Sequence, residues 1–500
     1  MRKTLGLILI VFGILTIFCL TSCQQEDARD PIDETLPSEE GLAPYLLLTS
    51  CEGGYSVALS VDTRELPAQI MLPATHRGSP IVKIADGGFC GAELSEIVMP
   101  STVKEIGNDA FKDCMRLERV TLSTSLETVG RRAFFGCVSL GEIVMPNGVR
   151  SVGEAAFYEC TSLEVAVLSE ALEAIEDHTF NKCTSLRSVI LPPSVSYVGT
   201  CAFYGCERLE AVVLSEKLNE IGEYAFFGCT ALRELDVPSS VRMIKDSAFS
   251  GCAALERVAI AEGLVNIADR AFAECCALTQ ITLPSSVREI GAEAFFGCAA
   301  LTSATLSDGV ESLGARAFSG CTTLTGIVLP ATLCRLGEYA FAECTALAHA
   351  EILGAERIET SAFYACTALE TLVLSEGLAE IGDNAFRGCV RLGEVVFPSS
   401  LQKIGAHAFR DCALRSVALP TALTSLGDYA FRECSRLSEL TISANLLRIG
   451  SGVFVGCSAL TSLHFDGACA RWNAIEKASG WMQGAEIRAV YCIDGIIEQI

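Results

Sequence analysis

The sequence LRSVILPPSVSYVGTCAFYGC, residues 186–206, contains the pattern that decides the fold. Residues 189–191 (VIL) have the period-two signature of a short β-strand. Pro192 follows directly, and a proline ends strand pairing because it has no backbone N–H. Val195 and Val198 then mark a second extended piece. The first part of this segment therefore predicts a strand, a turn and a second extended piece.

The second part of the same segment predicts a tight turn and a short helix. Gly199 allows a bend that a side chain could obstruct. Ala202, Phe203 and Cys206 fit one helical turn, which would place the phenylalanine and the cysteine on the same face. We therefore expect each coil of chain to end in a short helical turn.

Phe203 belongs to a series of seventeen phenylalanines that recurs along the chain. The spacing is 23 residues without exception from Phe111 to Phe341, and 22 or 23 elsewhere. Such self-similarity marks a solenoid, in which each unit buries its apolar face only against its neighbours. Seventeen copies leave no room for a conventional enzyme domain. The series is Phe89, Phe111, Phe134, Phe157, Phe180, Phe203, Phe226, Phe249, Phe272, Phe295, Phe318, Phe341, Phe363, Phe386, Phe409, Phe431 and Phe454.

Sixteen of the 25 cysteines lie three residues after a repeat phenylalanine, from Cys114 to Cys457. A residue at one fixed place in each coil forms a ladder facing the core, where a thiol behaves as a small hydrophobic group. Adjacent cysteines would lie ~5 Å apart, so disulfides or a metal ladder are alternatives. Parallel side chains rarely reach the disulfide torsion of about 90°. We therefore expect buried thiols.

The first 23 residues have the features of an export signal. Arg2 and Lys3 give a basic start, residues 4–20 are apolar, and the sequence LTSC ends at Cys23. A cysteine in this position resembles that of the bacterial lipobox, which is acylated and becomes the mature N-terminus. An ordinary signal peptide or a membrane anchor is the alternative, but the apolar run is short for a span of ~20 residues. We predict that residues 1–22 are a lipoprotein signal peptide and that Cys23 carries the lipid.

Residues 23–44 predict a disordered acidic tether, because seven acids, three prolines and almost no bulky apolar groups cannot bury enough surface to become ordered. The formal net charge of the whole chain is −24. That charge disfavours nucleic acid and electrostatic attachment to anionic lipid. We therefore expect contact with a membrane through the lipid anchor only.

The repeat unit L-x-x-I-x-L-P-x-x-L-x-x-I-G-x-x-A-F-x-x-C resembles the BspA-like leucine-rich repeat of bacterial cell-surface proteins. The resemblance implies a leucine-rich-repeat solenoid with parallel strands stacked coil on coil, short helical turns and a cap at each end. Residues 45–80 resemble the N-terminal cap and degenerate first coil of this family, and residues 81–465 resemble its repeats. Residues 466–500, which contain both tryptophans, resemble its C-terminal cap.

What the resemblance implies for function is adhesion through protein–protein binding to host matrix, host cells or other microbes. We expect an exported protein that is lipid-anchored at the outer membrane or cell surface and binds extracellular or host proteins. The alternative is a periplasmic structural or scaffolding lipoprotein that is not displayed on the surface. Neither the ligand nor the oligomeric state is predicted.

Catalytic motifs are missing from the sequence. The five histidines lie in different coils, and no H-E-x-x-H, P-loop or G-x-S-x-G occurs. Acidic residues do not recur in a calcium-ligand pattern. We therefore expect no enzyme activity, no cofactor and no metal. Cys469 and Cys492 flank the C-terminal cap and could form a disulfide.

Each strand has one outward position between two apolar inward positions, and this outward position is mostly apolar or threonine. Either β-branched residues occur there because they favour strands, or the row is an exposed apolar surface for a partner. The candidate binding face consists of Val144, Val167, Ile190, Val213, Thr282, Thr305, Val328, Val373 and Val396.

A second row lies one residue after the repeat phenylalanine and holds several aromatic residues. These residues could be half-buried packing between coils or aromatic anchors for a partner. The alternative binding row consists of Phe135, Tyr158, Tyr204, Phe227, Phe296 and Tyr364.

The lipid anchor gives a first testable prediction. If Cys23 is acylated, the substitution Cys23→Ala removes the thiol that carries the lipid. The variant should lose metabolic labelling with fatty acid and should leave the detergent phase on phase separation. Undiminished labelling of this variant would contradict the lipoprotein interpretation.

Overall fold

The computed structural model describes residues 44–60 and 66–498. The predicted signal peptide (1–22), nearly all of the predicted tether (23–44) and Cys23 lie outside the described residues. Among the residues that are described, no helix is long and apolar enough to cross a membrane.

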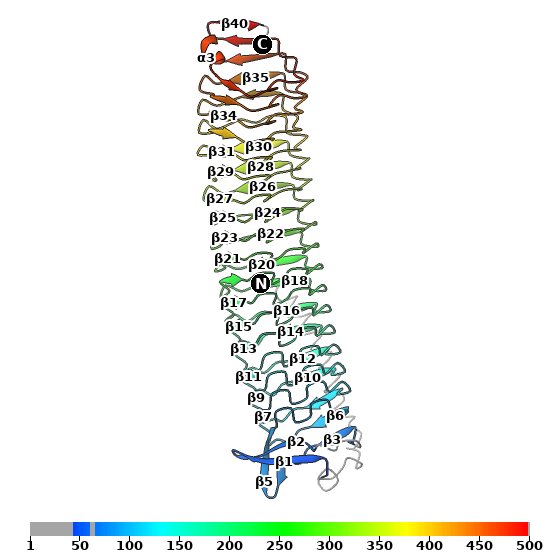
Figure 1. Ribbon diagram of the computed structural model, residues 1–500. Helices are drawn as coiled ribbons and strands as arrows, with labels where there is room; N and C mark the ends of the chain where they lie inside the picture. The colour runs from blue at the N-terminus through cyan, green and yellow to red at the C-terminus, as the bar shows by residue number, and fades with distance from the viewer. Residues whose placement is uncertain (1–43, 61–65, 499–500) are drawn as a thin grey trace. The chain divides into compact units, whose positions relative to one another are not determined.

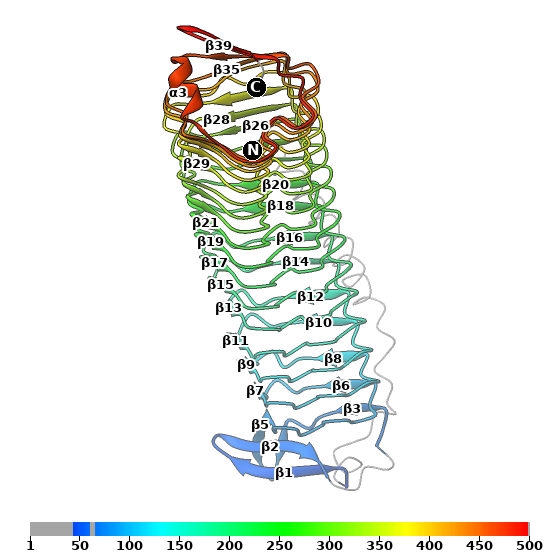
Figure 2. The same cartoon turned by 45° about the horizontal axis from the view of Figure 1, so that its top comes forward.

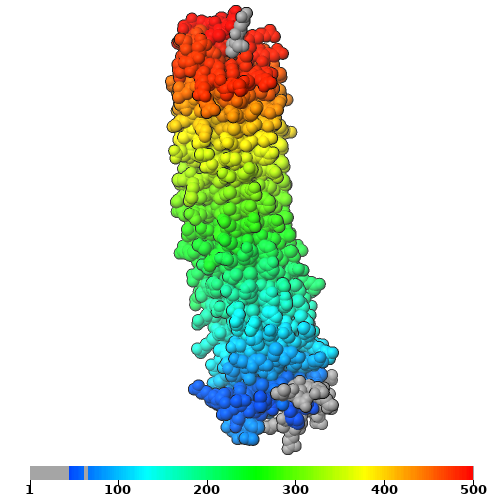
Figure 3. Space-filling view, in the orientation of Figure 1, coloured from blue at the N-terminus to red at the C-terminus, as the bar shows by residue number. Residues whose placement is uncertain are grey.

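The chain forms two compact units, and each is a parallel β-solenoid (Figure 1). Among the described residues, unit 1 comprises 44–60, 66–218 and 225–235, and unit 2 comprises 219–224 and 236–498. Nearly every coil contains two short strands, and the two series of strands lie on different faces (Figures 1 and 2). Successive coils of each unit are in direct contact over the face shown in Figure 3.

The first strand of each coil contains the outward row. In unit 1 these strands are β3 (Gln69–Met71), β6 (Glu96–Val98), β8 (Arg119–Thr121), β10 (Glu142–Val144), β12 (Val165–Val167), β14 (Ser188–Ile190) and β16 (Ala211–Val213). Strand β18 (Glu234–Val237) contains residues of both units. In unit 2 they are β20 (Arg257–Ile260), β22 (Gln280–Thr282), β24 (Ser303–Thr305), β26 (Gly326–Leu329), β28 (His349–Ile352), β30 (Thr371–Leu374), β33 (Ser416–Ala418), β35 (Glu439–Ile442) and β37 (Ser462–Phe465).

The second strand of each coil corresponds to the predicted second extended piece. In unit 1 these strands are β5 (Ser79–Ile84), β7 (Glu105–Ile106), β9 (Thr128–Val129), β11 (Ser151–Val152), β13 (Ala174–Ile175) and β15 (Tyr197–Val198). In unit 2 they are β17 (Glu220–Ile221), β19 (Met243–Ile244), β21 (Asn266–Ile267), β23 (Glu289–Ile290), β25 (Ser312–Leu313), β27 (Arg335–Leu336), β29 (Arg357–Ile358), β31 (Glu380–Ile381), β32 (Lys403–Ile404), β34 (Ser425–Leu426), β36 (Arg448–Ile449) and β38 (Glu476–Lys477).

The remaining elements lie near the chain ends. The first coils adjoin β1 (Leu46–Cys51), β2 (Gly54–Leu59) and β4 (Thr75–His76), and the last coils adjoin α3 (Cys469–Asn473), β39 (Ala489–Cys492) and β40 (Gly495–Glu498). Trp472 and Trp481 are both buried at this C-terminal end, with their ring centroids 6.0 Å apart. They also contact Phe465 and Phe454 respectively, so they cover the apolar interior of the last coils.

The segment around each repeat phenylalanine is a series of turns, so the predicted short helix is wrong. Arg132 and Gly136, two residues to either side of Phe134, have φ angles of 53° and 71°. A right-handed helix cannot pass through such left-handed residues. The same pair of left-handed positions flanks every repeat phenylalanine. Helix α3 is the only helix of the described residues.

The backbone N–H groups of these turns donate alternately to the neighbouring coil and within the turn itself. The N–H of Phe134 donates to the carbonyl oxygen of Ala156 in the next coil at 2.8 Å. A tight bend precedes each turn, as Gly199 predicted, because a Cβ atom there would lie 2.6 Å from the backbone nitrogen of Asp177. The close approach of successive coils therefore favours glycine at residue 199, although other coils, such as that of Lys245, make the same bend without glycine.

Stacked phenylalanine rings form the centre of each unit. The rings of Phe111 and Phe134 have centroids 5.1 Å apart and planes within 7° of parallel. The seventeen repeat phenylalanines are all fully buried. This offset stacking brings aromatic surface out of water in every coil, which is the largest apolar contribution that a single repeat position makes.

The sixteen repeat cysteines are buried thiols, as the sequence predicted. These thiols donate to a carbonyl oxygen in the preceding coil: Cys160 Sγ, for example, donates to the carbonyl oxygen of Phe134 at 3.2 Å. That oxygen also accepts the N–H of Cys137, three residues along, at 3.1 Å. We call the repeated Sγ-to-carbonyl contact the thiol ladder. This contact gives the thiol an acceptor, and it gives the second lone pair of a buried carbonyl oxygen a donor.

Burial raises the pKa of thirteen of these thiols, from Cys137 to Cys457, above the ordinary range of cysteine. Desolvation is the main cause, and it raises the pKa of Cys457 to about 12 and that of Cys160 and Cys206 further. The unfolded chain, with thiol pKa values of about 8.5, loses protons at a pH where the folded chain keeps them. The stability that the neutral thiols give is therefore fully present below pH 8.5 and decreases as the pH rises above it.

The thiol ladder thus predicts unusual sensitivity to alkali in the presence of a reductant. Above pH 8.5, each buried thiol lowers the free energy of unfolding by about 1.4 kcal/mol per pH unit. Urea midpoints measured between pH 8 and pH 10 should therefore fall steeply. In the variant with Cys160, Cys183 and Cys206 changed to alanine, the slope of unfolding free energy against pH should decrease by about 4 kcal/mol per pH unit. A midpoint independent of pH over this interval would contradict the prediction.

Candidate protein-binding face

The parallel pairing places the outward residues of unit 1 in one column. Val144 of β10 lies opposite Val167 of β12. Ile190 of β14 lies opposite Val213 of β16. Because parallel neighbours are ~4.8 Å apart, the column presents one side chain at each such step. Val144 and Ile190 are exposed, while Val167 and Val213 are half-buried.

The outward residues of unit 2 form a column of the same kind. Thr282 and Thr305 are register partners, and both are exposed. Val328 and Val373 are each the register partner of Glu351 in β28. The next coil has no first strand in the described structure, and its outward residue is Val396.

Three valines of unit 2 are exposed members of the candidate binding face. The exposed fractions of Val328, Val373 and Val396 are 48%, 41% and 82%. Their inward neighbours Ile327 and Leu372 are buried. β-Propensity explains the choice of valine in a strand, but it does not offset the exposure of so much apolar surface to water.

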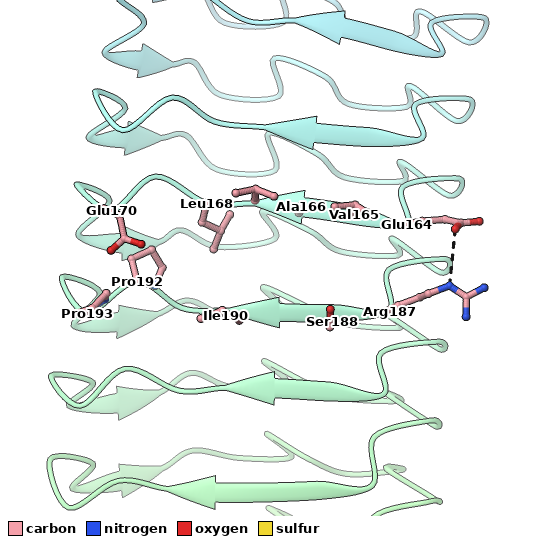
Figure 4. A pocket seen from close by; sticks show the side chains of 11 residues that line it. Glu164, Val165, Ala166, Leu168, Glu170, Arg187, Ser188, Ile190, Pro192 and Pro193 are labelled. Carbon is pink, nitrogen blue, oxygen red and sulfur yellow. Dashed lines mark ion pairs between the residues drawn. The ribbon is translucent and has the colours of Figure 1, made fainter. Parts of the chain in front are cut away.

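A hollow of about 230 Å³ lies between β12 and β14 on this face (Figure 4). Its centre is apolar and is lined by the β12 residues and by Ile190. Glu170, Pro192 and Pro193 lie at one end (Figure 4).

At the other end of the hollow, Arg187 Nε lies 3.7 Å from the carboxylate of Glu164 (Figure 4). This ion pair was not identified as functional from the sequence. Its two residues occupy the same repeat position, seven residues after the repeat phenylalanine, in successive coils.

The local pairing accounts for this hollow. Strands β12 and β14 are register partners only at Val165 and Ser188, whereas β14 and β16 pair along all three residues. A proline has no N–H with which to continue the ladder, and Pro192 lies two residues after the end of β14. In addition, Ala166 takes the inward position that Val189 occupies in the next coil. The double proline at 192–193 is the one sequence signal that could have indicated the hollow.

The alternative binding row consists of stacked, half-buried aromatic side chains. The rings of Phe135 and Tyr158 lie 4.8 Å apart with an angle of 4° between their planes. Lys112 and Lys182 each place an ammonium group over one ring of this pair. The other members of the row are likewise half-buried. Their geometry is that of packing between coils, one of the two interpretations of the sequence.

Four of the histidines have an aromatic neighbour. His76 contacts Tyr55, His178 contacts Tyr158, His407 stacks on Tyr429 and His464 stacks on Tyr491. Burial is the main cause of a lowered pKa at His407, and nearby arginines lower it further. These histidines therefore contribute to packing within the coils of their own unit.

Known proteins support the fold. Among solved structures, a leucine-rich repeat protein from Bacteroides ovatus is similar, with a TM-score of 0.55 and 23% identity over 90% of this chain and 98% of that chain. A leucine rich cell surface protein from Faecalibacterium prausnitzii A2-165 gives a TM-score of 0.39 and 22% identity, with 87% of this chain and 97% of that chain covered. No curated protein matches the sequence.

The family described as BspA type leucine rich repeat region matches residues 82–206, 162–275, 265–371 and 356–474. These overlapping matches cover most of the chain, and the parallel two-strand coils described above have the architecture expected of leucine-rich repeats. The chain therefore belongs to the BspA-like leucine-rich repeat family of bacterial surface proteins.

Proposed function

We propose that this protein is a lipid-anchored adhesin that binds macromolecular partners along the candidate binding face. The observation that carries the proposal is the exposed apolar column, in which Val328, Val373 and Val396 expose between 41% and 82% of their surface. A solenoid offers such a column as an extended contact surface. The partners are extracellular or host proteins, including those on other microbial cells.

Binding along this column would consist of many small apolar contacts in a fixed geometry. Each β-branched side chain has few rotamers, so little side-chain entropy is lost when a partner covers it. The inward side chains are packed in the core, so the column keeps its geometry without a partner. Because solenoid folds of this family are typically non-enzymatic, we propose that the protein acts by binding alone.

The location of the protein distinguishes adhesion from the alternative, a periplasmic scaffolding role. A surface adhesin has to be accessible from outside the cell. Protease added to intact cells should therefore digest the protein without lysis, and digestion only after lysis would favour the periplasmic alternative.

The binding face gives a prediction about specific side chains. Changing Val328, Val373 and Val396 together to lysine should abolish adhesion, because the ammonium groups would have to lose water against the partner. The inward residues are untouched, so each substitution should change the free energy of unfolding by less than ~0.5 kcal/mol. Adhesion to immobilised matrix proteins and partner cells, with thermal unfolding as a fold check, measures both effects.

A matched control is available in the same unit. Val265, Val390 and Leu447 are exposed to 41%, 52% and 55%, and all three lie outside the binding face. Their combined change to lysine adds the same charge and removes comparable apolar surface, and it should leave adhesion intact. Equal adhesion by both triple variants would exclude the valine column and direct attention to the aromatic row around Phe135 and Tyr158.

A further inference from the structure

The C-terminal cap brings together three side chains that are suited to binding a soft divalent metal. Cys469 begins α3, Cys492 ends β39, and Asp494 lies in the turn that leads to β40. The two Sγ atoms and one carboxylate oxygen all lie within 4.8 Å of one another. The backbone N–H of Cys469 also donates to Asp494 Oδ1 at 2.7 Å, which holds the start of α3 against this turn.

The basic side chains near the cluster in the sequence have other partners, and Arg488 pairs with Glu486 at 3.5 Å. Arg471 donates to the carbonyl oxygens of Ala444 and Leu446, at 3.2 and 3.3 Å. Lys477 donates to the carbonyl oxygen of Trp472 at 2.7 Å, and its ammonium group lies 4.7 Å from the centre of that ring. The three ligand-type groups therefore have no cation from these residues.

Without a cation, the charged forms of these three groups would be unfavourable together. Two thiolates and a carboxylate in such a small volume would repel one another. A divalent cation would remove that repulsion, and two thiol protons would pass to the solvent on binding.

We propose that Cys469, Cys492 and Asp494 bind a divalent cation of the zinc class through two thiolates and one carboxylate oxygen. Thiolate donors favour zinc over calcium or magnesium. The usual zinc distances of ~2.3 Å to sulfur and ~2.1 Å to oxygen place the donors less than ~4 Å apart. Because the cysteines are half-buried and Asp494 is exposed, side-chain rotation can close the remaining gap. A water molecule takes the fourth position.

Bound metal would connect α3 to the β39–β40 turn across the final strand pairing. Strand β39 pairs with β37, so the site lies where the last repeat coils meet the cap. Terminal caps protect the open end of a solenoid from solvent and from association with other chains. This inference is independent of the proposed adhesion, because no residue of the binding face takes part.

Cobalt(II) added to the reduced full-length protein tests the site. Tetrahedral thiolate ligation should give a ligand-to-metal absorption band that saturates at one cobalt per chain, and zinc should remove the band. Cys469→Ser and Cys492→Ser should each abolish it. Asp494→Asn should weaken cobalt binding about 10-fold or more. Zinc should raise the unfolding temperature of the native cap and should not do so in Asp494→Asn.

Control variants use exposed cysteines elsewhere in unit 2. Cys276→Ser and Cys334→Ser should leave the cobalt titration unchanged, since both thiols are exposed and lie outside the cap. The thiol ladder is fully buried and is closed to added metal. A band that persists in Cys469→Ser would overturn the proposal. So would a reduced protein that forms the Cys469–Cys492 disulfide on oxidation but gives no band with cobalt.

Discussion

The carbonyl oxygen of the repeat phenylalanine is the group on which the packing of the coils depends. In the coil of Phe134 it accepts one bond from Cys137 within the turn and one from the thiol of Cys160 in the next coil. A buried carbonyl oxygen without partners would cost free energy in every coil. The thiol satisfies it while remaining small enough to leave the stacked rings in contact. The stacked ring and the hydrogen-bonded carbonyl oxygen therefore belong to the same residue, which explains why phenylalanine and cysteine recur together.

Two independent sets of requirements act on the two faces of each first strand. Inward residues such as Val189 must fill the core, and packing fixes their size. Outward residues such as Ile190 have no such constraint, yet they stay apolar through most coils. Core packing does not constrain an outward position. Where such a position still remains apolar, a selective pressure other than folding is expected to act. For this reason the binding proposal rests on exposure in the structure rather than on the valine pattern alone.

The features that could be predicted from the sequence are those that repeat along the chain. The period of the phenylalanines gave the solenoid, the alternation at residues 189–191 gave the outward row, and the fixed place of the cysteines gave buried thiols. The helix prediction was wrong because side-chain spacing does not reveal φ. Arg132 is left-handed although its residue type gives no such indication. Cys469 and Asp494 belong to the cap, which does not repeat, so periodicity could not bring them together.

The thiol ladder also has a direction, because each sulfur donates to the coil before it. The first repeat phenylalanine has Ala92, not cysteine, three residues later. No earlier repeat phenylalanine exists to accept a thiol there, so the ladder begins with an acceptor alone: Phe89 accepts Cys114 Sγ at 2.9 Å. Within each unit, every internal coil offers the same donor on one side and the same acceptor on the other. Loss or duplication of a whole coil by recombination therefore rejoins matching surfaces, and the array can change length without a new core having to be invented.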